Sequence, residues 1–259
     1  MRTAFQIQRD VIYALLLREV GSRFGKSRVG FLWVMAEPVA HLVFPILIFG
    51  FLLDRVMPGG VDYPIFLVYG FLPFLFFKTI CLQTMDGVST NRGLLSYRQI
   101  TLMDVFVAKA LAYCAIESMV FAIVLAGLAI LEFQVLPAYP IEFAGALVLT
   151  VTLAFGLGLL FAATASVVPD SKSIFRILFL PLYFASGVLF PVTRFPDEWV
   201  DLLALNPVLH LLELSRYAAI EHYEPIRQLN VLYPTSLALI TNLMGLAMYR
   251  LRYLSRVTM

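Results

Sequence analysis

The sequence predicts an all-α integral membrane protein with six transmembrane helices, and two observations carry this prediction. Of the 259 residues, 61% are hydrophobic and 14% charged, with a mean hydropathy of +0.86, whereas a soluble domain is about half apolar and one quarter charged. The apolar residues also gather in long runs, and each span needs about 20 of them. This composition excludes disordered, coiled-coil and soluble-enzyme classes, and it predicts a single transmembrane domain over residues 1–259.

Residues 1–29 are expected to form an amphipathic helix on the membrane surface, followed by a basic turn. Its apolar stripe comprises Ile7, Val11, Ala14 and Leu15, while Ile12, Leu16 and Leu17 lie off that face. The segment Gly21–Ser27 has three residues between its glycines, where a phosphate-binding loop needs four. We therefore interpret it as a turn against lipid headgroups, and the chain is not expected to hydrolyse ATP itself.

The six spans are expected at about 30–53, 63–85, 105–131, 143–168, 174–192 and 232–249. Cytoplasmic flanks of a membrane protein carry an excess of Lys and Arg, and most of the 19 cations fall on the side of the two termini. Both termini are therefore predicted to be cytoplasmic. Arg55, Arg194, Arg216 and Arg227 remain on the external side.

Two connections are long enough to have structure of their own. Residues 86–104 form the largest inner loop, and residues 193–231 form the external connection between spans five and six. In the external connection, Pro196 followed by two acids is a helix-start signal, and Asn206-Pro207 interrupts the chain before a second helix. The leucines of these two helices predict a pair that re-enters the membrane or lies on it, rather than a solvated loop.

No pattern typical of an active site is present, neither a metal-ligand spacing nor a nucleophile motif. Single ionisable residues within spans, such as Glu37, His41, Lys78 and Glu117, are costly in a membrane unless they are paired or face water. They allow two interpretations, a substrate path or structural pairing, and both stay open.

Three segments carry a resemblance to a known family. Arg23–Trp33 followed by Glu37-Pro38 resembles the start of the first span in type-2 ABC export permeases, and Gly187–Pro191 with Leu205–Arg216 resembles their external region. Within that family the chain is most similar to the capsular polysaccharide export permeases of Gram-negative bacteria, a subgroup that Asn91–Arg98 also fits. The resemblance covers essentially the whole chain.

The resemblance implies a homodimer in the bacterial inner membrane that works with two copies of a separate ABC ATPase, which bind ATP and Mg. No cofactor, metal or nucleic acid is expected in this chain. The implied substrate is a lipid-linked acidic polysaccharide, and a periplasmic polysaccharide co-polymerase or adaptor and an outer-membrane channel are the implied further partners. The alternatives are a permease for another lipid-linked glycan (an O-antigen or a teichoic-acid-like polymer), a membrane-embedded enzyme acting on lipid-linked sugars, and an ion-coupled carrier.

The resemblance also places candidate site residues. The residues expected to dock on the ATPase are Asn91, Arg92, Leu94, Leu95, Tyr97 and Arg98. The external region contributes Pro196, Trp199, Asn206, Pro207, His210, Glu213 and Arg216. The headgroup or acidic sugars of the incoming substrate are expected to meet Arg23, Lys26 and Arg28, although these cations also serve as the orientation signal. A channel lining is expected from Phe74, Phe77, Tyr183, Phe184 and Phe190, for which packing or lipid contact is the alternative.

Overall fold

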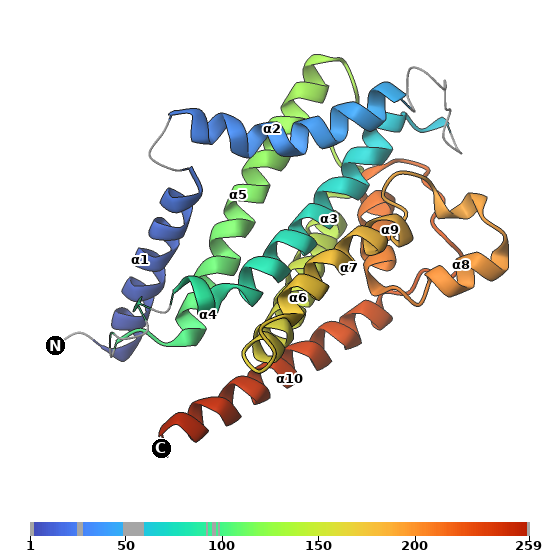
Figure 1. Ribbon diagram of the computed structural model, residues 1–259. Coiled ribbons are helices and arrows are strands. Elements are labelled where there is room, and N and C mark those ends of the chain that lie inside the picture. Colours follow the sequence, from blue (N-terminus) through green and yellow to red (C-terminus); the bar gives the residue numbers. More distant parts are fainter. Residues whose placement is uncertain are drawn as a thin grey trace.

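The computed structural model describes residues 3–24, 28–48, 60–91, 93–94, 97 and 99–257. All regular structure in these ranges is helical, without a β-strand. The elements, labelled in Figure 1, are α1 (Ala4–Phe24), α2 (Arg28–Pro45), α3 (Tyr63–Met85), α4 (Gly87–Thr90), α5 (Leu102–Ile130), α6 (Pro140–Ala165), α7 (Ser171–Ala185), η4 (Val192–Arg194), α8 (Asp197–Leu203), α9 (Pro207–Ala219) and α10 (Leu232–Val257).

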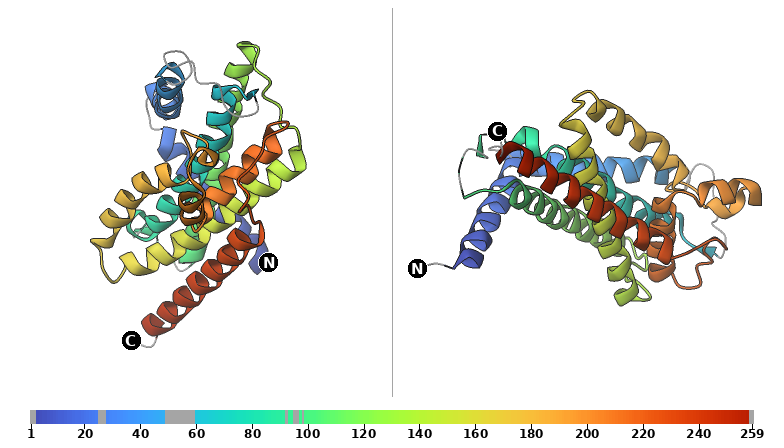
Figure 2. Two further views of the ribbon diagram at one scale, coloured as in Figure 1. Left: turned by 90° about the vertical axis from the view of Figure 1, so that its right-hand side faces the viewer. Right: turned by 90° about the horizontal axis from the view of Figure 1, so that it is seen from below.

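Three of the helices, α3, α5 and α6, are long and apolar enough to cross a membrane. The chain is therefore an all-helical integral membrane protein, while the number of six spans stays a prediction. Figures 1 and 2 show both chain termini at the same end of the molecule as α4, with α8 and the start of α3 at the opposite end. We refer to these as the inner end and the outer end.

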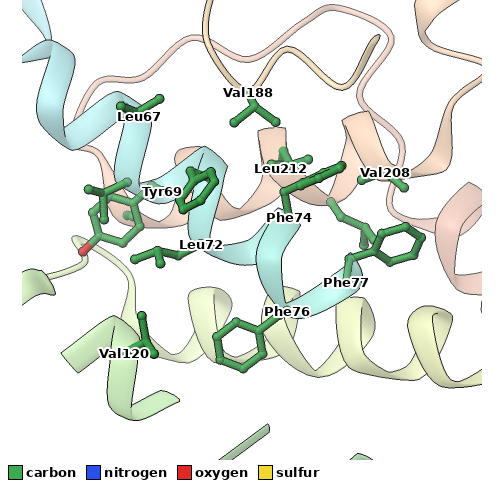
Figure 3. Packing of buried hydrophobic residues seen from close by; sticks show 14 of the residues in the cluster. Leu67, Tyr69, Leu72, Phe74, Phe76, Phe77, Val120, Val188, Val208 and Leu212 are labelled. Carbon is green, nitrogen blue, oxygen red and sulfur yellow. The ribbon is translucent and has the colours of Figure 1, made fainter. Parts of the chain in front are cut away.

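Helix α3 forms the centre of the molecule, and its bounds coincide with those predicted for the second span. It packs against α5, α6 and α9, and Phe66, Leu67 and Tyr69 have no exposed surface. Figure 3 shows Phe74 and Phe76 projecting to opposite sides of this helix. Because neighbouring helices cover α3, it is apolar all round and has no amphipathic face.

The helix of the fifth predicted span is shorter than expected. Helix α7 ends at Ala185, and Gly187 has a positive φ of +65°, a backbone conformation that stops a helix and suits glycine. A Cβ at Gly187 would also lie 2.4 Å from a methyl group of Val192. Helix α7 therefore ends before residue 192, the predicted end of the fifth span, and it has a length of about 22 Å, less than a bilayer core of about 30 Å.

Several further boundaries differ from the prediction. Residues 166–168, placed at the end of the fourth span, follow the end of α6 as a turn, and α10 continues to Val257, beyond residue 249. Helix α5 begins three residues before its predicted span because Thr101 and Asp104 form a reciprocal capping box.

The face of α1 that packs on α5 matches the predicted stripe only in part. Leu15 is buried against Val105 and Ala108, and Val11 and Ile12 pack beside it. Ile7 and Ala14, also placed in the stripe, are exposed. The contacts with α5, rather than the apolar periodicity of α1 alone, decide which residues lie on the inward face.

Candidate functional site

A buried ion pair at the inner end joins α1 to α5. Lys109 in α5 is 2% exposed, and its ammonium group donates a hydrogen bond to a carboxylate oxygen of Glu19 in α1. The amide oxygen of Gln83 in α3 lies 3.5 Å from the same ammonium group. Because a buried charge without a partner is costly, this pair fixes the position of α1 against the bundle.

Asn91, the first of the predicted docking residues, lies in the same region and is 2% exposed. Its amide nitrogen donates to the carbonyl of Gly87 at 3.1 Å and to the hydroxyl of Thr90 at 3.0 Å. Its amide oxygen accepts a hydrogen bond from the guanidinium of Arg18 in α1. We call Arg18, Glu19, Asn91 and Lys109 the inner polar cluster; it connects α1, the end of α4 and α5.

A second set of ion pairs connects the same turn to α7. Asp86, between α3 and α4, accepts from Lys172 at 3.0 Å and from Arg176 at 2.6 Å. The α4 turn is thus bonded to α1 through Asn91 and to α7 through Asp86, and Val88 of α4 packs on Phe106 of α5.

The remaining predicted docking and substrate-contact residues are only partly described. Leu94 packs against the cluster around Leu15, Tyr97 is 65% exposed, and Arg23 is exposed in the last turn of α1. The side chains that lie outside the described part of the structure are those of Lys26, Arg28, Arg92, Leu95 and Arg98.

The aromatic residues predicted to line a channel fall into separate groups. Phe74 and Tyr183 meet edge to face at 5.3 Å between ring centroids, and Phe184, 48% exposed, follows at 5.4 Å from Tyr183. Phe77 is buried and faces Phe179. Phe190 lies apart, against Phe195. Phe74, Tyr183 and Phe184 thus form one aromatic contact between α3 and α7. The role of all five residues in a channel stays a prediction.

His41 and Glu117, two of the ionisable residues within predicted spans, occupy different surroundings. The His41 ring stacks on Phe71 with 5.5 Å between centroids, and Glu117 is 6% exposed within α5. The side chain of Glu37 lies outside the described residues.

At the outer end, Arg216 of α9 is fully buried and forms the centre of a second polar cluster. Its guanidinium donates to the carbonyls of Phe66 at 3.3 Å, Gly187 at 2.9 Å and Val188 at 3.0 Å. It also lies over the Phe66 ring, 3.7 Å from the centroid, close enough for a cation–π interaction. A Cβ at Gly70 would overlap this guanidinium, so the α3 glycine provides the space for it.

Glu213, one turn earlier in α9, balances the charge of Arg216 and is equally buried. Its carboxylate accepts from Arg216 at 3.3 Å, from the hydroxyl of Tyr223 at 3.0 Å and from the backbone N–H of Ile226 at 3.2 Å. Burial, reinforced by the Glu213 carboxylate, raises the pKa of Tyr223, so its phenol remains a donor at physiological pH. We call Glu213, Arg216 and Tyr223 the outer polar cluster.

The outer polar cluster gives Arg216, which the sequence placed on the external side and in the external region, a fully buried position. The arginine holds the carbonyls of the turn that ends α7 and those of the α3 core, which lie far from it in sequence. Sequence reasoning missed Tyr223 and Gly187 as its partners. An available signal was the spacing of Glu213 and Arg216, three residues apart and so on one helix face, among leucines.

The other residues predicted in the external region fix the two helices there. Asn206 caps α9, with its side chain accepting from the N–H of Val208 at 3.0 Å, and Pro207 occupies the first turn. His210 accepts from the N–H of Asn230 at 3.2 Å, so its other ring nitrogen donates to the carbonyl of Ala204 at 2.8 Å. At α8, Pro196 is the N-cap and Trp199 is 58% exposed.

The contacts of these clusters hold helices together. Both sets of polar groups are engaged in ion pairs and hydrogen bonds between helices. Among the described residues, no group of three or more His, Cys, Asp or Glu is placed to hold a metal ion. The two polar clusters therefore connect the helices at each end of the bundle.

Comparisons with known proteins agree on one family. The family described as ABC-2 type transporter matches residues 10–220. Polysialic acid transport protein KpsM of Escherichia coli is 34% identical over 97% of this chain and 96% of its own length. Capsule polysaccharide export inner-membrane protein CtrC of Neisseria meningitidis serogroup B is 27% identical over 93% of this chain and 91% of its own. O-antigen export system permease protein RfbA of Myxococcus xanthus is 26% identical over 84% and 83%, respectively. The chain therefore belongs to the ABC-2 type transporter family of membrane proteins.

Proposed function

We propose that this chain is the membrane-spanning subunit of an ATP-driven exporter that moves lipid-linked capsular polysaccharide across the inner membrane. The observation that carries the proposal is the identity of 34% with KpsM over nearly the full length of both chains. The capsule export protein CtrC supports the same substrate class. The relatedness to RfbA favours export of an O-antigen as the second candidate.

In this proposal ATP and Mg are bound by two copies of a separate ATPase that dock at the inner end. The attachment of the α4 turn to α1, α5 and α7 supports this site, because a push on the turn reaches all three helices. ATP binding can shift a transporter between two conformations only if its contacts differ between these conformations. Residues 91–98 would receive that push, with Asn91 anchoring the segment to α1.

The working permease in this proposal is a homodimer of six-span protomers with cytoplasmic termini. Support comes from α7, whose apolar surface has much exposed area in a single protomer, at Ile174, Ile177, Leu178, Leu180 and Phe184. Such a surface needs lipid or protein to cover it. A periplasmic adaptor and an outer-membrane channel would then carry the polymer onward.

The substrate assignment is tested in a strain that lacks the gene for this chain. We expect surface polysaccharide to disappear, the polymer to accumulate in the cytoplasm, and the plasmid-borne gene to restore export. The purified chain alone should hydrolyse no ATP, and an ABC ATPase should co-purify with it. Unchanged surface polysaccharide, or robust ATP hydrolysis by the chain alone, would contradict the proposal.

The docking assignment is tested separately by charge reversal at Arg92 and Arg98. We expect R92E and R98E to reduce co-purification of the ATPase while membrane insertion is unchanged. Arg227, exposed at the outer end, offers the matched control, because R227E makes the same charge change away from the proposed site. Equal pull-down of ATPase by all three variants would place docking elsewhere.

A further inference from the structure

A groove with a volume of about 560 Å³ runs between α6, α9 and the start of α10. Its lining includes Glu142, Gly145 and Thr152 of α6, Tyr217 of α9 and Thr235 of α10. This volume falls within the range of about 300–1,000 Å³ typical of small-molecule sites. None of the polar clusters described above uses these residues.

The wall of the groove is apolar even where threonines line it. The hydroxyl of Thr152 donates to the carbonyl of Val148 at 2.7 Å, and that of Thr235 donates to the carbonyl of Val231 at 2.7 Å. Both hydroxyls are thus bonded within their own helices. A ligand in this part of the groove gains from burying hydrocarbon and not from hydrogen bonds.

The groove has the length of one leaflet of a bilayer. Ten residues separate Glu142 from Thr152 along α6, which is about 15 Å, half of a hydrocarbon core of about 30 Å. Helix α6 is one of the three helices able to span a membrane, and Val148, which lines the groove, is 65% exposed. The groove therefore opens toward the acyl chains of the surrounding lipid.

The outer end of the groove carries a negative charge. Glu142 lies in the first turn of α6 and is the one charged residue among those that line the groove. Beside it, Tyr139 and Tyr217 stack with 6.5 Å between ring centroids, and tyrosines are enriched at the headgroup level of membranes. A carboxylate at this depth attracts an ammonium group and repels a headgroup with net negative charge.

We propose that the groove binds an acyl chain of a phospholipid with an ammonium headgroup, phosphatidylethanolamine, in the leaflet at the outer end. The acyl chain lies along α6 from Gly145 to Thr152, and the ammonium group faces Glu142. The proposed lipid site requires only that the chain spans a membrane. Its test is therefore independent of which polysaccharide the permease exports.

Native mass spectrometry of the full-length chain in mild detergent, titrated with phosphatidylethanolamine or phosphatidylglycerol, tests the site. A Cβ at Gly145 or at Gly127 in α5 meets no atom within 4 Å, so both glycines accept a larger side chain. G145F fills the groove, and G127F is the matched control on another span. Loss of contact with two methylene groups of the acyl chain weakens phospholipid binding about tenfold. We expect this loss of affinity in G145F and not in G127F.

Headgroup preference provides the second measurement and does not require filling the groove. We expect wild type to prefer phosphatidylethanolamine and E142K to prefer phosphatidylglycerol. Equal affinity of wild type and G145F for phosphatidylethanolamine, or an unchanged preference in E142K, would overturn the proposal. If G145F instead displaced a bound lipid-linked glycan, the substrate would be the occupant of the groove and the proposal would be overturned. If G145F alone dissociated a dimer, the occupant would be a second copy of the chain, which would also overturn it.

Discussion

Replacing Arg216 with methionine removes the central cation of the outer polar cluster while keeping most of the side-chain volume. Four hydrogen bonds are lost, to the carbonyls of Phe66, Gly187 and Val188 and to the carboxylate of Glu213. Glu213 then stays buried with two neutral donors, from Tyr223 and Ile226. Removing one partner of a buried pair costs about 3–5 kcal/mol, a large share of the 5–15 kcal/mol of a typical folded protein.

A double-mutant cycle separates the ion pair from the hydrogen bonds to carbonyls. The variant E213Q/R216M has no uncompensated charge, so we expect it to be more stable than the sum of the single changes predicts, by about 1–3 kcal/mol. R216K keeps the charge but lacks the planar guanidinium that reaches Gly187 and Val188 together, so it should fall between wild type and R216M.

The assay is unfolding of the purified chain in mixed detergent micelles, followed by the fluorescence of its two tryptophans. Trp199 lies in α8 at the outer end, so its signal reports on this region. Arg227 is exposed, and R227M should change the free energy of unfolding by less than about 0.5 kcal/mol. The reasoning is refuted if R216M matches R227M, or if the effects of E213Q and R216M are additive.

Three further predictions concern other parts of the bundle. K109M leaves the buried Glu19 with only the more distant guanidinium of Arg18, at 3.7 Å, so the contact of α1 with α5 should loosen, and tryptic cleavage within α1 should become at least about tenfold faster. G156L should destabilise the contact between α6 and α10 by about 1–3 kcal/mol, measured as a lower Tm, because a Cβ there lies 2.5 Å from the hydroxyl oxygen of Thr241. N206A removes the cap of α9 and should cost about 1 kcal/mol in micelle unfolding.

Each of these predictions has a control. E19Q/K109M should restore part of the protection of α1, and cleavage as fast as in K109M alone would argue against an ion pair. G127L adds the same side chain where a Cβ meets no atom, so a Tm as low as that of G156L would show that the α6–α10 packing is not the cause. N206D keeps a capping oxygen, and it should be more stable than N206A.

The helices of the apolar core were the part of the fold that the sequence predicted best. The bounds of α3 follow from Pro64 in its first turn and Asp86 directly after its end, both local signals. The start of α9 likewise follows from Asn206-Pro207. Such features depend on neighbouring residues, and these are visible in a single sequence.

The features that the sequence did not predict depend on contacts between distant residues. Arg216 resembles a surface cation until its partners are known, and Phe66 precedes it by 150 residues. The end of α7 was misplaced because the apolar pattern continues through Val188 and Leu189, while Gly187 ends the helix. The face of α1 was predicted in part: Val11 and Leu15 pack on α5 as expected, whereas Ile12 joins them and Ala14 is exposed, which periodicity within α1 does not show.

The distance in sequence between Arg216 and its partners has a consequence for the order in which the chain assembles. Synthesis proceeds from the N-terminus, so α3 and the turn at Gly187 leave the ribosome before α9 exists. Glu213 and Arg216 emerge together, three residues apart, and enter the protein as a neutral pair. A nascent chain that stops before residue 213 therefore contains every apolar helix up to α8, but its outer end has not yet closed.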